Sequence, residues 1–211
     1  MERFDASSAS IQKALRLLKD EQLVHGRPGS AVYVLESRRE TLTPAAYSQP
    51  AEAGAPYRWL TEAKKQGKRA SIQLLEVKEL RPPQDVAAAL GLGDGEKALM
   101  RKQLLSFDPD PCELVKSFYP LELARGTAMM EFKKIKGGTP TLLADLGYPP
   151  RRTLDEVSAE EPTNEEYEAL LLPRQVPVLR TLRVVLSDGD RPIEATTMAK
   201  AGHLYALRYE F

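Results

Sequence analysis

The chain has 211 residues, and its 30 basic and 30 acidic side chains give a formal net charge of zero. This length allows one large domain or two small ones, and the balanced charge excludes a basic field over the whole protein, so any nucleic-acid binding must be local. The lone Cys112 excludes a disulfide framework and a cysteine metal cluster, and the histidines at 25 and 203 are isolated. With neither a signal peptide nor a membrane-spanning apolar run, we expect a cytoplasmic protein without a metal or cofactor.

The first predicted element is an amphipathic helix that begins at Ser7 or Ser8 and ends near Gln22. Either serine can accept hydrogen bonds from the free backbone N–H groups of a helix start. Apolar residues recur at helical spacing and form one face of this helix: Ile11, Ala14, Leu15 and Leu18. Two short strands are predicted next, at residues 23–24 and 32–34. Between them Arg27-Pro28-Gly29-Ser30 is typical of a type II turn, because proline fixes φ at its second position and glycine allows positive φ at its third.

A helix with small and basic side chains on its polar face, followed at once by a tight basic hairpin, is the arrangement of a recognition helix and a wing. The first-turn side chains of such a helix can reach base edges in a major groove. Arg27 and the backbone amides of Gly29 and Ser30 can contact phosphate. An ordinary amphipathic helix and hairpin within a globular core would give the same periodicity.

The sequence IQKALRLLKDEQLV followed by RPGSAVYV resembles the winged helix of the GntR family of bacterial transcription regulators, over residues 6–34. Together with the helix pattern, the resemblance implies a set of DNA-contacting residues: Ser8, Ser10, Gln12, Lys13, Arg16, Arg27, Gly29 and Ser30. Ser8 stands where relatives often have arginine, so the operator is expected to differ from theirs. A winged helix needs two further helices, so residues 1–35 are expected to form a partial DNA-binding domain. If the protein begins at Met1, we expect weak or absent DNA binding.

Residues 36–56 are polar and rich in proline and are predicted to be a linker, and residues 57–211 are predicted to form the second domain. That domain should start with a short helix over 57–66 and a strand from Arg69. A repeat follows, each copy being a helix and then a hairpin: a helix stopped by Gly91 with strands 97–107 and 112–119, then a helix capped by Thr163 and Glu166 with strands 176–186 and 193–200. Two such units can form a pseudo-symmetric antiparallel sheet with their helices on one side, an α+β architecture. Chance similarity between common units is the alternative.

The segment between the two copies contains KKIKGGTPTLLADLGYPP. Thr139 is predicted to cap a helix whose first residue is Pro140 and which Gly147 ends. A strand over residues 152–159 should then place Arg152, Leu154 and Glu156 on one face.

A second resemblance covers residues 69–211. The stretches DVAAALGL, EKALMRKQLLSF, ELVKSFYP, KIKGGTPTLLADLGYPP and RPIEATTMAKAGHLYALRYEF resemble the effector-binding (UTRA) domain of the HutC-type branch of the GntR family, which is related in fold to chorismate lyase. The resemblance implies a chorismate-lyase-like antiparallel sheet domain with helices, a small-molecule effector, a homodimer and a double-stranded DNA operator with two half-sites. Strands late in the chain that lie at an edge of the sheet are expected to form the dimer contact.

Several polar residues are expected to contact the effector, seven of them by resemblance and Glu156 as a further hydrogen-bond acceptor: Arg101, Gln103, Ser117, Thr139, Arg152, Glu156, Glu194 and Tyr205. Arg152 can clamp a carboxylate or phosphate bidentately, so an anionic effector is expected, with Arg152 in one cleft with Arg101, Ser117 and Glu194. Arg151 should then face the other way. Two departures from the family pattern leave a less polar effector, or no effector, as the alternatives. Related sequences often carry a carboxylate at Val115, and often Asp-Arg in place of His203-Leu204.

The leading hypothesis is a dimeric transcription repressor that a small molecule releases from DNA. One alternative is a chorismate-lyase-like enzyme in which Arg101, Arg152 and Glu156 hold and protonate an anionic substrate. The sequence shows no nucleophile–base pair, metal-ligand spacing or phosphate loop, so we do not expect an enzyme. A third hypothesis is an effector sensor that has lost DNA binding.

Overall fold

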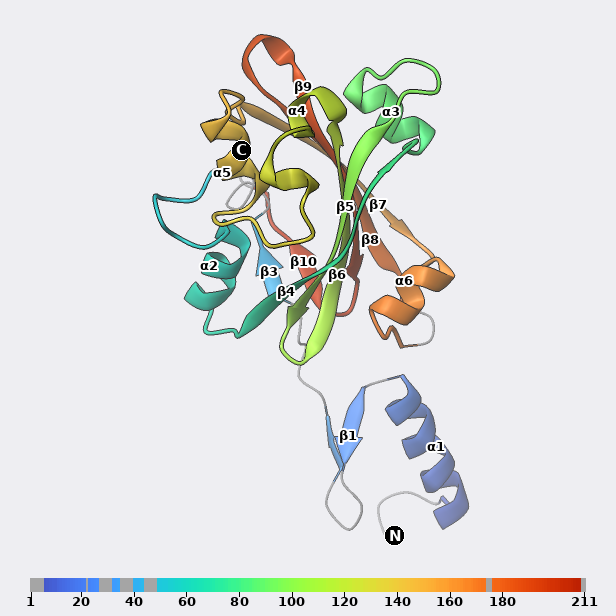
Figure 1. Cartoon of the computed structure of the whole chain (residues 1–211). Helices are drawn as coiled ribbons and strands as arrows, with labels where there is room; N and C mark the ends of the chain where they lie inside the picture. The colour runs from blue at the N-terminus through green and yellow to red at the C-terminus, as the bar shows by residue number, and fades with distance from the viewer. Residues whose placement is uncertain are drawn as a thin grey trace.

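The computed structural model describes residues 6–21, 23–26, 32–34, 40–43, 49–173 and 176–209. Its N-terminal part contains helix α1 (Ser8–Asp20) and strands β1 (Val24–Gly26) and β2 (Val32–Val34), which pair antiparallel (Figure 1). The Ser7 hydroxyl accepts the backbone N–H of Ser10 at 3.1 Å, which confirms the predicted helix start. The predicted type II turn, with Arg27, Gly29 and Ser30, lies outside the described residues. No side chain of α1 is buried by the part of the chain that the structure describes.

The stretch predicted to be a linker contains a short strand, β3 (Glu40–Leu42). It pairs in parallel with β10 (Tyr205–Leu207), so that Glu40 lies opposite Tyr205 and Leu42 opposite Leu207. Three residues are too few to show the alternation of apolar and polar side chains that marks a strand. This segment is a strand only because it pairs with β10, far along the chain.

Six strands among the described residues form one antiparallel sheet in the order β4-β5-β6-β9-β8-β7. Their bounds are β4 (Ala70–Leu80), β5 (Ala98–Phe107), β6 (Asp110–Pro120), β7 (Arg152–Glu160), β8 (Val178–Leu186) and β9 (Pro192–Ala201). The predicted hairpins β5–β6 and β8–β9 meet at the centre through β6 and β9, and β4 and β7 form the edges. The predicted pseudo-symmetric sheet is therefore present, with one added edge strand for each unit.

The helices of the two repeat units, α3 (Gln84–Leu90) and α6 (Asn164–Ala169), lie on one face of the sheet (Figure 1). Val86 and Leu90 of α3 pack against Met100 and Phe118, which are cross-strand partners. Glu165 of α6 forms ion pairs with Lys102 and Lys116, which are the next cross-strand pair on that face. Gly91 ends α3 in the left-handed region at a φ of 67°, and Thr163 and Glu166 form the predicted capping box of α6.

The opposite face is covered by α2 (Arg58–Lys65), α4 (Leu121–Ala124), the 3-10 turn η2 (Ala128–Met130) and α5 (Thr139–Asp145). Leu143 of α5 packs with Leu99, Tyr119 and Val185 of the sheet. A second 3-10 turn, η3 (Asp188–Asp190), joins β8 to β9 where the sequence predicts a turn. No helix among the described residues is both long and apolar enough to cross a membrane.

The start of α5 differs by one residue from the prediction. Gly138 is the N-cap and Thr139 is the first helical residue, so Thr139 does not cap this helix. Gly138 has a φ of 82°, and a Cβ atom there would lie 2.5 Å from Cδ2 of Tyr57. Only glycine fits both the backbone conformation and this close approach, which fixes where the helix begins.

Candidate ligand-binding cavity

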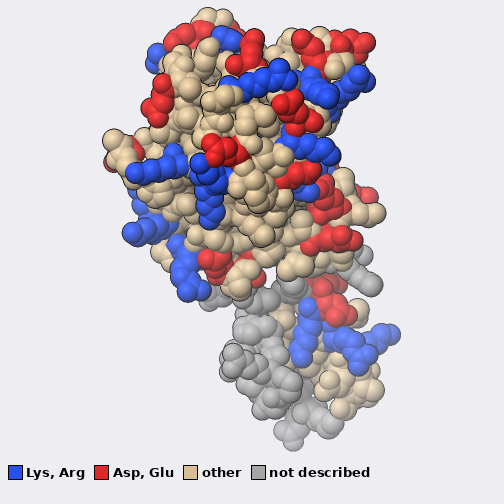
Figure 2. Space-filling view, in the orientation of Figure 1, with Lys and Arg blue, Asp and Glu red and all other residues tan. Residues whose placement is uncertain are grey.

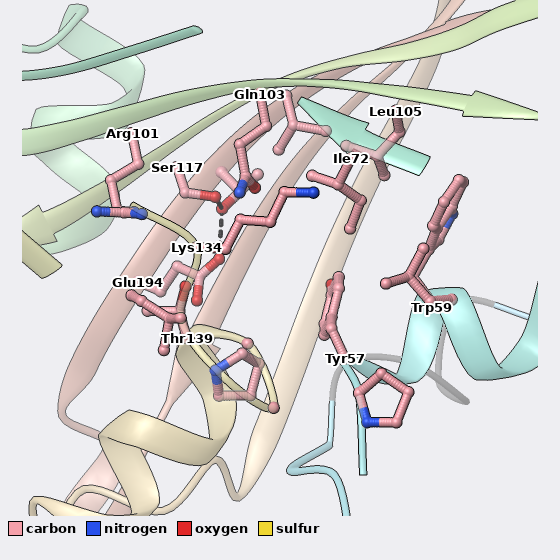
Figure 3. Close-up of a pocket in the computed structure, with 18 of the residues that line it drawn as sticks. Tyr57, Trp59, Ile72, Arg101, Gln103, Leu105, Ser117, Lys134, Thr139 and Glu194 are labelled. Carbon is pink, nitrogen blue, oxygen red and sulfur yellow. Dashed lines mark hydrogen bonds between the residues drawn. The ribbon is translucent and has the colours of Figure 1, made fainter. Parts of the chain in front are cut away.

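A cavity of about 430 Å³ lies between the second face of the sheet and the segments that cover it (Figure 3). Strands β5, β6 and β9 form its floor, the start of α2 forms one wall, and residues 134–140 form the other. This volume is in the range of small-molecule sites, which combine an apolar lining with a few convergent polar groups.

Strand alternation brings several of the predicted effector residues into this cavity. Arg101 lies opposite Ser117 in the β5–β6 pair, and Ser117 lies opposite Thr196 in the β6–β9 pair, so the three side chains cross the floor in one row. Five predicted residues line the cavity: Arg101, Gln103, Ser117, Thr139 and Glu194. Their contact with a ligand stays a prediction.

Glu194 is part of a hydroxyl network on the cavity floor. Oγ1 of Thr196 lies 2.6 Å from Oε1 of Glu194 and 2.8 Å from Oγ of Ser117. The Thr196 hydroxyl has one proton and the carboxylate can only accept, so Thr196 donates to Glu194 and accepts from Ser117. Burial raises the pKa of Glu194, and the hydrogen bond from Thr196 and the charge of Arg183 oppose this shift. Glu194 therefore offers a hydrogen-bond acceptor, in a poorly hydrated site, to a hydroxyl or amine group of a ligand.

Arg101 lines the cavity but directs its guanidinium elsewhere. Nη1 donates to the carbonyl oxygens of Met129 at 2.5 Å and Glu131 at 2.9 Å, and Nη2 donates to that of Lys133 at 2.7 Å. Arg101 is 2% exposed, and burial lowers the pKa of its guanidinium. The arginine thus holds the segment that leads into the cavity wall at Lys134, and three of its five N–H donors are engaged by backbone.

Arg152 does not share the cleft with Arg101, Ser117 and Glu194, which corrects the prediction from sequence. Asp155 of β7 pairs with Arg183, a cavity residue, so the odd-numbered residues of β7 face the cavity side and Arg152 faces the other side. Arg152 is exposed and lies 3.1 Å from Asp190. Arg151 does not line the cavity either. It is also exposed, and its Nε lies 2.8 Å from Oδ1 of Asp188. Glu156 shares the face of Arg152, is exposed and does not line the cavity.

Tyr205 lies behind the cavity rather than in its lining. It is 2% exposed, and its hydroxyl donates to Oε2 of Glu113 at 2.9 Å. Glu113 does line the cavity. The Tyr205 hydroxyl therefore reaches the cavity through Glu113.

The structure adds lining residues that the sequence did not indicate: Tyr57, Trp59, Ile72, Glu113, Lys134 and Arg183. Tyr57 and Trp59 form an aromatic wall, and Trp59 stacks on Phe107 with ring centroids 5.3 Å apart. Arg183 makes a two-point contact with Asp155, both nitrogens at 2.7 Å. Lys134 is exposed at the mouth of the cavity. No local pattern marked these residues, because they come from separate elements that only the fold brings together. Among the described residues, no group of three or more His, Cys, Asp or Glu side chains could hold a metal ion.

The predicted DNA-contacting residues of α1 are all exposed: Ser8, Ser10, Gln12, Lys13 and Arg16. Figure 2 shows the basic side chains of α1 gathered on the N-terminal part of the chain. Ser10 also takes part in the helix cap, because its hydroxyl lies 2.9 Å from that of Ser7. The DNA contacts of these residues stay predictions.

Comparison with known proteins gives consistent matches. The UTRA domain family matches residues 65–206. An uncharacterized HTH-type transcriptional regulator of Streptomyces coelicolor is 30% identical over 149 residues, which are 68% of this chain and 54% of the relative. The chain thus spans about half the length of that curated relative.

Solved structures share the fold. PhnF from Mycobacterium smegmatis has a TM-score of 0.66 at 21% identity, covering 99% of this chain and 88% of PhnF. The C-terminal domain of the histidine utilization repressor from Pseudomonas syringae pv. tomato has a TM-score of 0.58 at 20% identity, covering 68% of this chain and 99% of that domain. At these identities the structures support the architecture of the sheet and its helices.

Proposed function

The chain belongs to the UTRA domain family, and from that premise we propose that it is a GntR-family transcription regulator of the HutC type that a small molecule controls. One observation carries the proposal. The domain that the family matches, together with residues 54–60, lines a cavity of about 430 Å³, and the same chain places an exposed basic helix and a hairpin ahead of that domain. A sensor cavity and a DNA-reading element in one chain are the two parts that such a regulator needs.

The proposed domain organisation is a partial winged helix over residues 1–35, a linker over 36–56 and the effector domain over 57–211. The protein would act in the cytoplasm as a homodimer on two operator half-sites. Edge strand β7 supports an isologous contact, because its outer edge is unpaired within the described chain and Leu154 and Val157 are exposed. Effector binding would favour a dimer geometry that no longer matches the half-site spacing, so the protein would act as a repressor.

The lining of the cavity supports an effector with an apolar or aromatic body and a hydrogen-bond donor. Tyr57, Ile72 and Met198 offer apolar surface, and Glu194 offers an acceptor. The arginines of the floor make fixed contacts, Arg101 with backbone carbonyls and Arg183 with Asp155. An anionic group on the effector would therefore lie at the mouth, near Lys134, rather than on the floor.

The enzyme alternative has little support from the cavity. Of the three residues that it requires, Arg152 and Glu156 lie outside the lining, and Arg101 is engaged by three carbonyl groups. A binding role for the cavity fits this arrangement better than an acid–base role.

The test is selection of operator DNA from a random pool, followed by binding measurements at several salt concentrations. Lys13→Ala should weaken binding to all sequences and lower the salt slope by about one unit, because a phosphate contact releases a counterion. Arg27→Ala should do the same. Lys78→Ala, which removes an equal charge from an exposed side chain of β4, should leave affinity unchanged. Selection that yields no preferred sequence would favour the sensor that has lost DNA binding.

A further inference from the structure

The β3–β10 ribbon ties the linker to the effector domain. Its three residue pairs lie outside the six-stranded sheet, and Nε2 of Gln66 in the loop after α2 donates to the carbonyl oxygen of Thr41 at 3.2 Å. Short two-stranded ribbons are marginally stable, so pairing and release of β3 are two accessible states. Because β3 lies between the N-terminal hairpin and α2, these states also change how the N-terminal part is tethered.

Two series of contacts run from the cavity and meet at Tyr205, the first residue of β10. The polar series consists of one contact: Glu113 lines the cavity and accepts a hydrogen bond from the Tyr205 hydroxyl at 2.9 Å. The aromatic series begins at Trp59 in the cavity wall, which stacks on Phe107 at 5.3 Å, and Phe107 lies against the Tyr205 ring at 5.7 Å. A change at either lining residue therefore reaches the start of β10.

Glu113 is held in place from its other side. Its Oε1 lies 3.2 Å from Nζ of Lys200, and the side chains of this pair are 2% and 1% exposed. Breaking a buried ion pair is strongly unfavourable, so the carboxylate keeps Lys200 as its partner. When an occupant of the cavity shifts Glu113, the contact that yields is the hydrogen bond with Tyr205.

We propose that Tyr205 transmits occupancy of the cavity to the linker, and this rests on the proposed function. An occupant that displaces Glu113 or Trp59 shifts Tyr205, weakens the pairing of β10 with β3 and releases the linker strand. The reverse also holds by linkage, because release of β3 must change the affinity of the cavity for its occupant by the same factor. The population shift is limited by the difference in that affinity between the two states.

The test needs no effector, because a large side chain can occupy the cavity. Gln103 is half-buried and points into the cavity (Figure 3), so Gln103→Trp fills part of it. Hydrogen exchange of the backbone of residues 40–42 should become roughly fivefold faster or more in Gln103→Trp. In a Tyr205→Phe background, which lacks the bond to Glu113 but keeps a ring against Phe107, the same substitution should accelerate exchange clearly less than it does with Tyr205 present. Unchanged exchange in central strands β6 and β9 confirms that the sheet is intact.

A matched control comes from Glu194, the second carboxylate residue in the cavity lining. Glu194→Gln should leave exchange of residues 40–42 unchanged, because Glu194 bonds Thr196 on the cavity floor, whereas Tyr205 bonds Glu113. If Gln103→Trp disturbs β6 and β9, Val115→Phe fills the same cavity from the next strand. Equal acceleration in both Tyr205 backgrounds, or none in either, would overturn the proposal. These measurements use no DNA. A negative result therefore leaves the proposed regulator function standing, and a chain that does not bind DNA can still show the coupling between the cavity and the linker strand.

Discussion

Replacing Arg101 by methionine tests whether this arginine positions the cavity wall or binds the ligand. The guanidinium makes three hydrogen bonds to the carbonyls of Met129, Glu131 and Lys133. A hydrogen bond to a charged group contributes about 1.5–3 kcal/mol. Met129 is fully buried, so its carbonyl loses its partner outright, whereas Glu131 and Lys133 are exposed and their carbonyls can bind water instead.

The wild-type protein also bears the desolvation cost of a guanidinium that is 2% exposed, and the substitution removes that cost. We therefore expect Arg101→Met to lower the free energy of unfolding by about 2–4 kcal/mol. This sum counts the bond to Met129 in full and the bonds to Glu131 and Lys133 in part, and subtracts the desolvation cost that the substitution removes. For a domain of roughly 150 residues that is a fall of about 4–16 °C in Tm. Hydrogen exchange should speed up most in residues 129–138.

The assay is urea unfolding of the ligand-free protein, with Arg125→Met as the matched control. Arg125 is an exposed arginine whose contact is a surface pair with Glu79 at 3.2 Å, so its loss should have little effect. If Arg101→Met is as stable as the control to within about 1 kcal/mol and exchange in residues 129–138 is unchanged, the positioning role is refuted. Arg101 would then be available to a ligand, as the sequence resemblance implies.

Three further predictions concern the cavity and a helix cap. Folding raises the pKa of Glu194 above its ordinary value of 4.5. The wild-type protein should therefore lose stability relative to Glu194→Gln as the pH rises from below 4.5 through the raised pKa. Parallel pH profiles of the unfolding free energy of the two proteins would contradict this. Gly138→Ala should destabilise the domain by more than about 1 kcal/mol and move Tyr57, because φ is 82° and the added Cβ would lie 2.5 Å from the ring; an unchanged Tm would show that the wall relaxes freely. Thr163→Ala removes half of the capping box and should cost about 1 kcal/mol in thermal unfolding, whereas Thr163→Ser should cost much less.

Local sequence patterns determined most of the elements and their order. The helix start at Ser7, the end of α3 at Gly91 and the capping box of Thr163 and Glu166 follow from groups within a few residues of one another. The repeat of helix and hairpin also predicted an antiparallel sheet with its helices on one side, whereas the order of the strands, with β6 paired to β9 at the centre, comes from the structure. Alternation correctly grouped Arg152 with Glu156 on one strand face, and the same alternation places Arg101 and Gln103 on the cavity face of β5.

Only the tertiary structure decided which face holds the cavity and which polar groups remain available in it. Alternation gives two equivalent faces, and the choice between them at β7 depends on Arg183 meeting Asp155 across the strand pair. Arg101 looks like an anion clamp in sequence, but the carbonyls that engage it lie about 30 residues away in a segment with no regular pattern. The pairing of β3 with β10 likewise joins residues that are more than 160 positions apart, so no local preference could signal it.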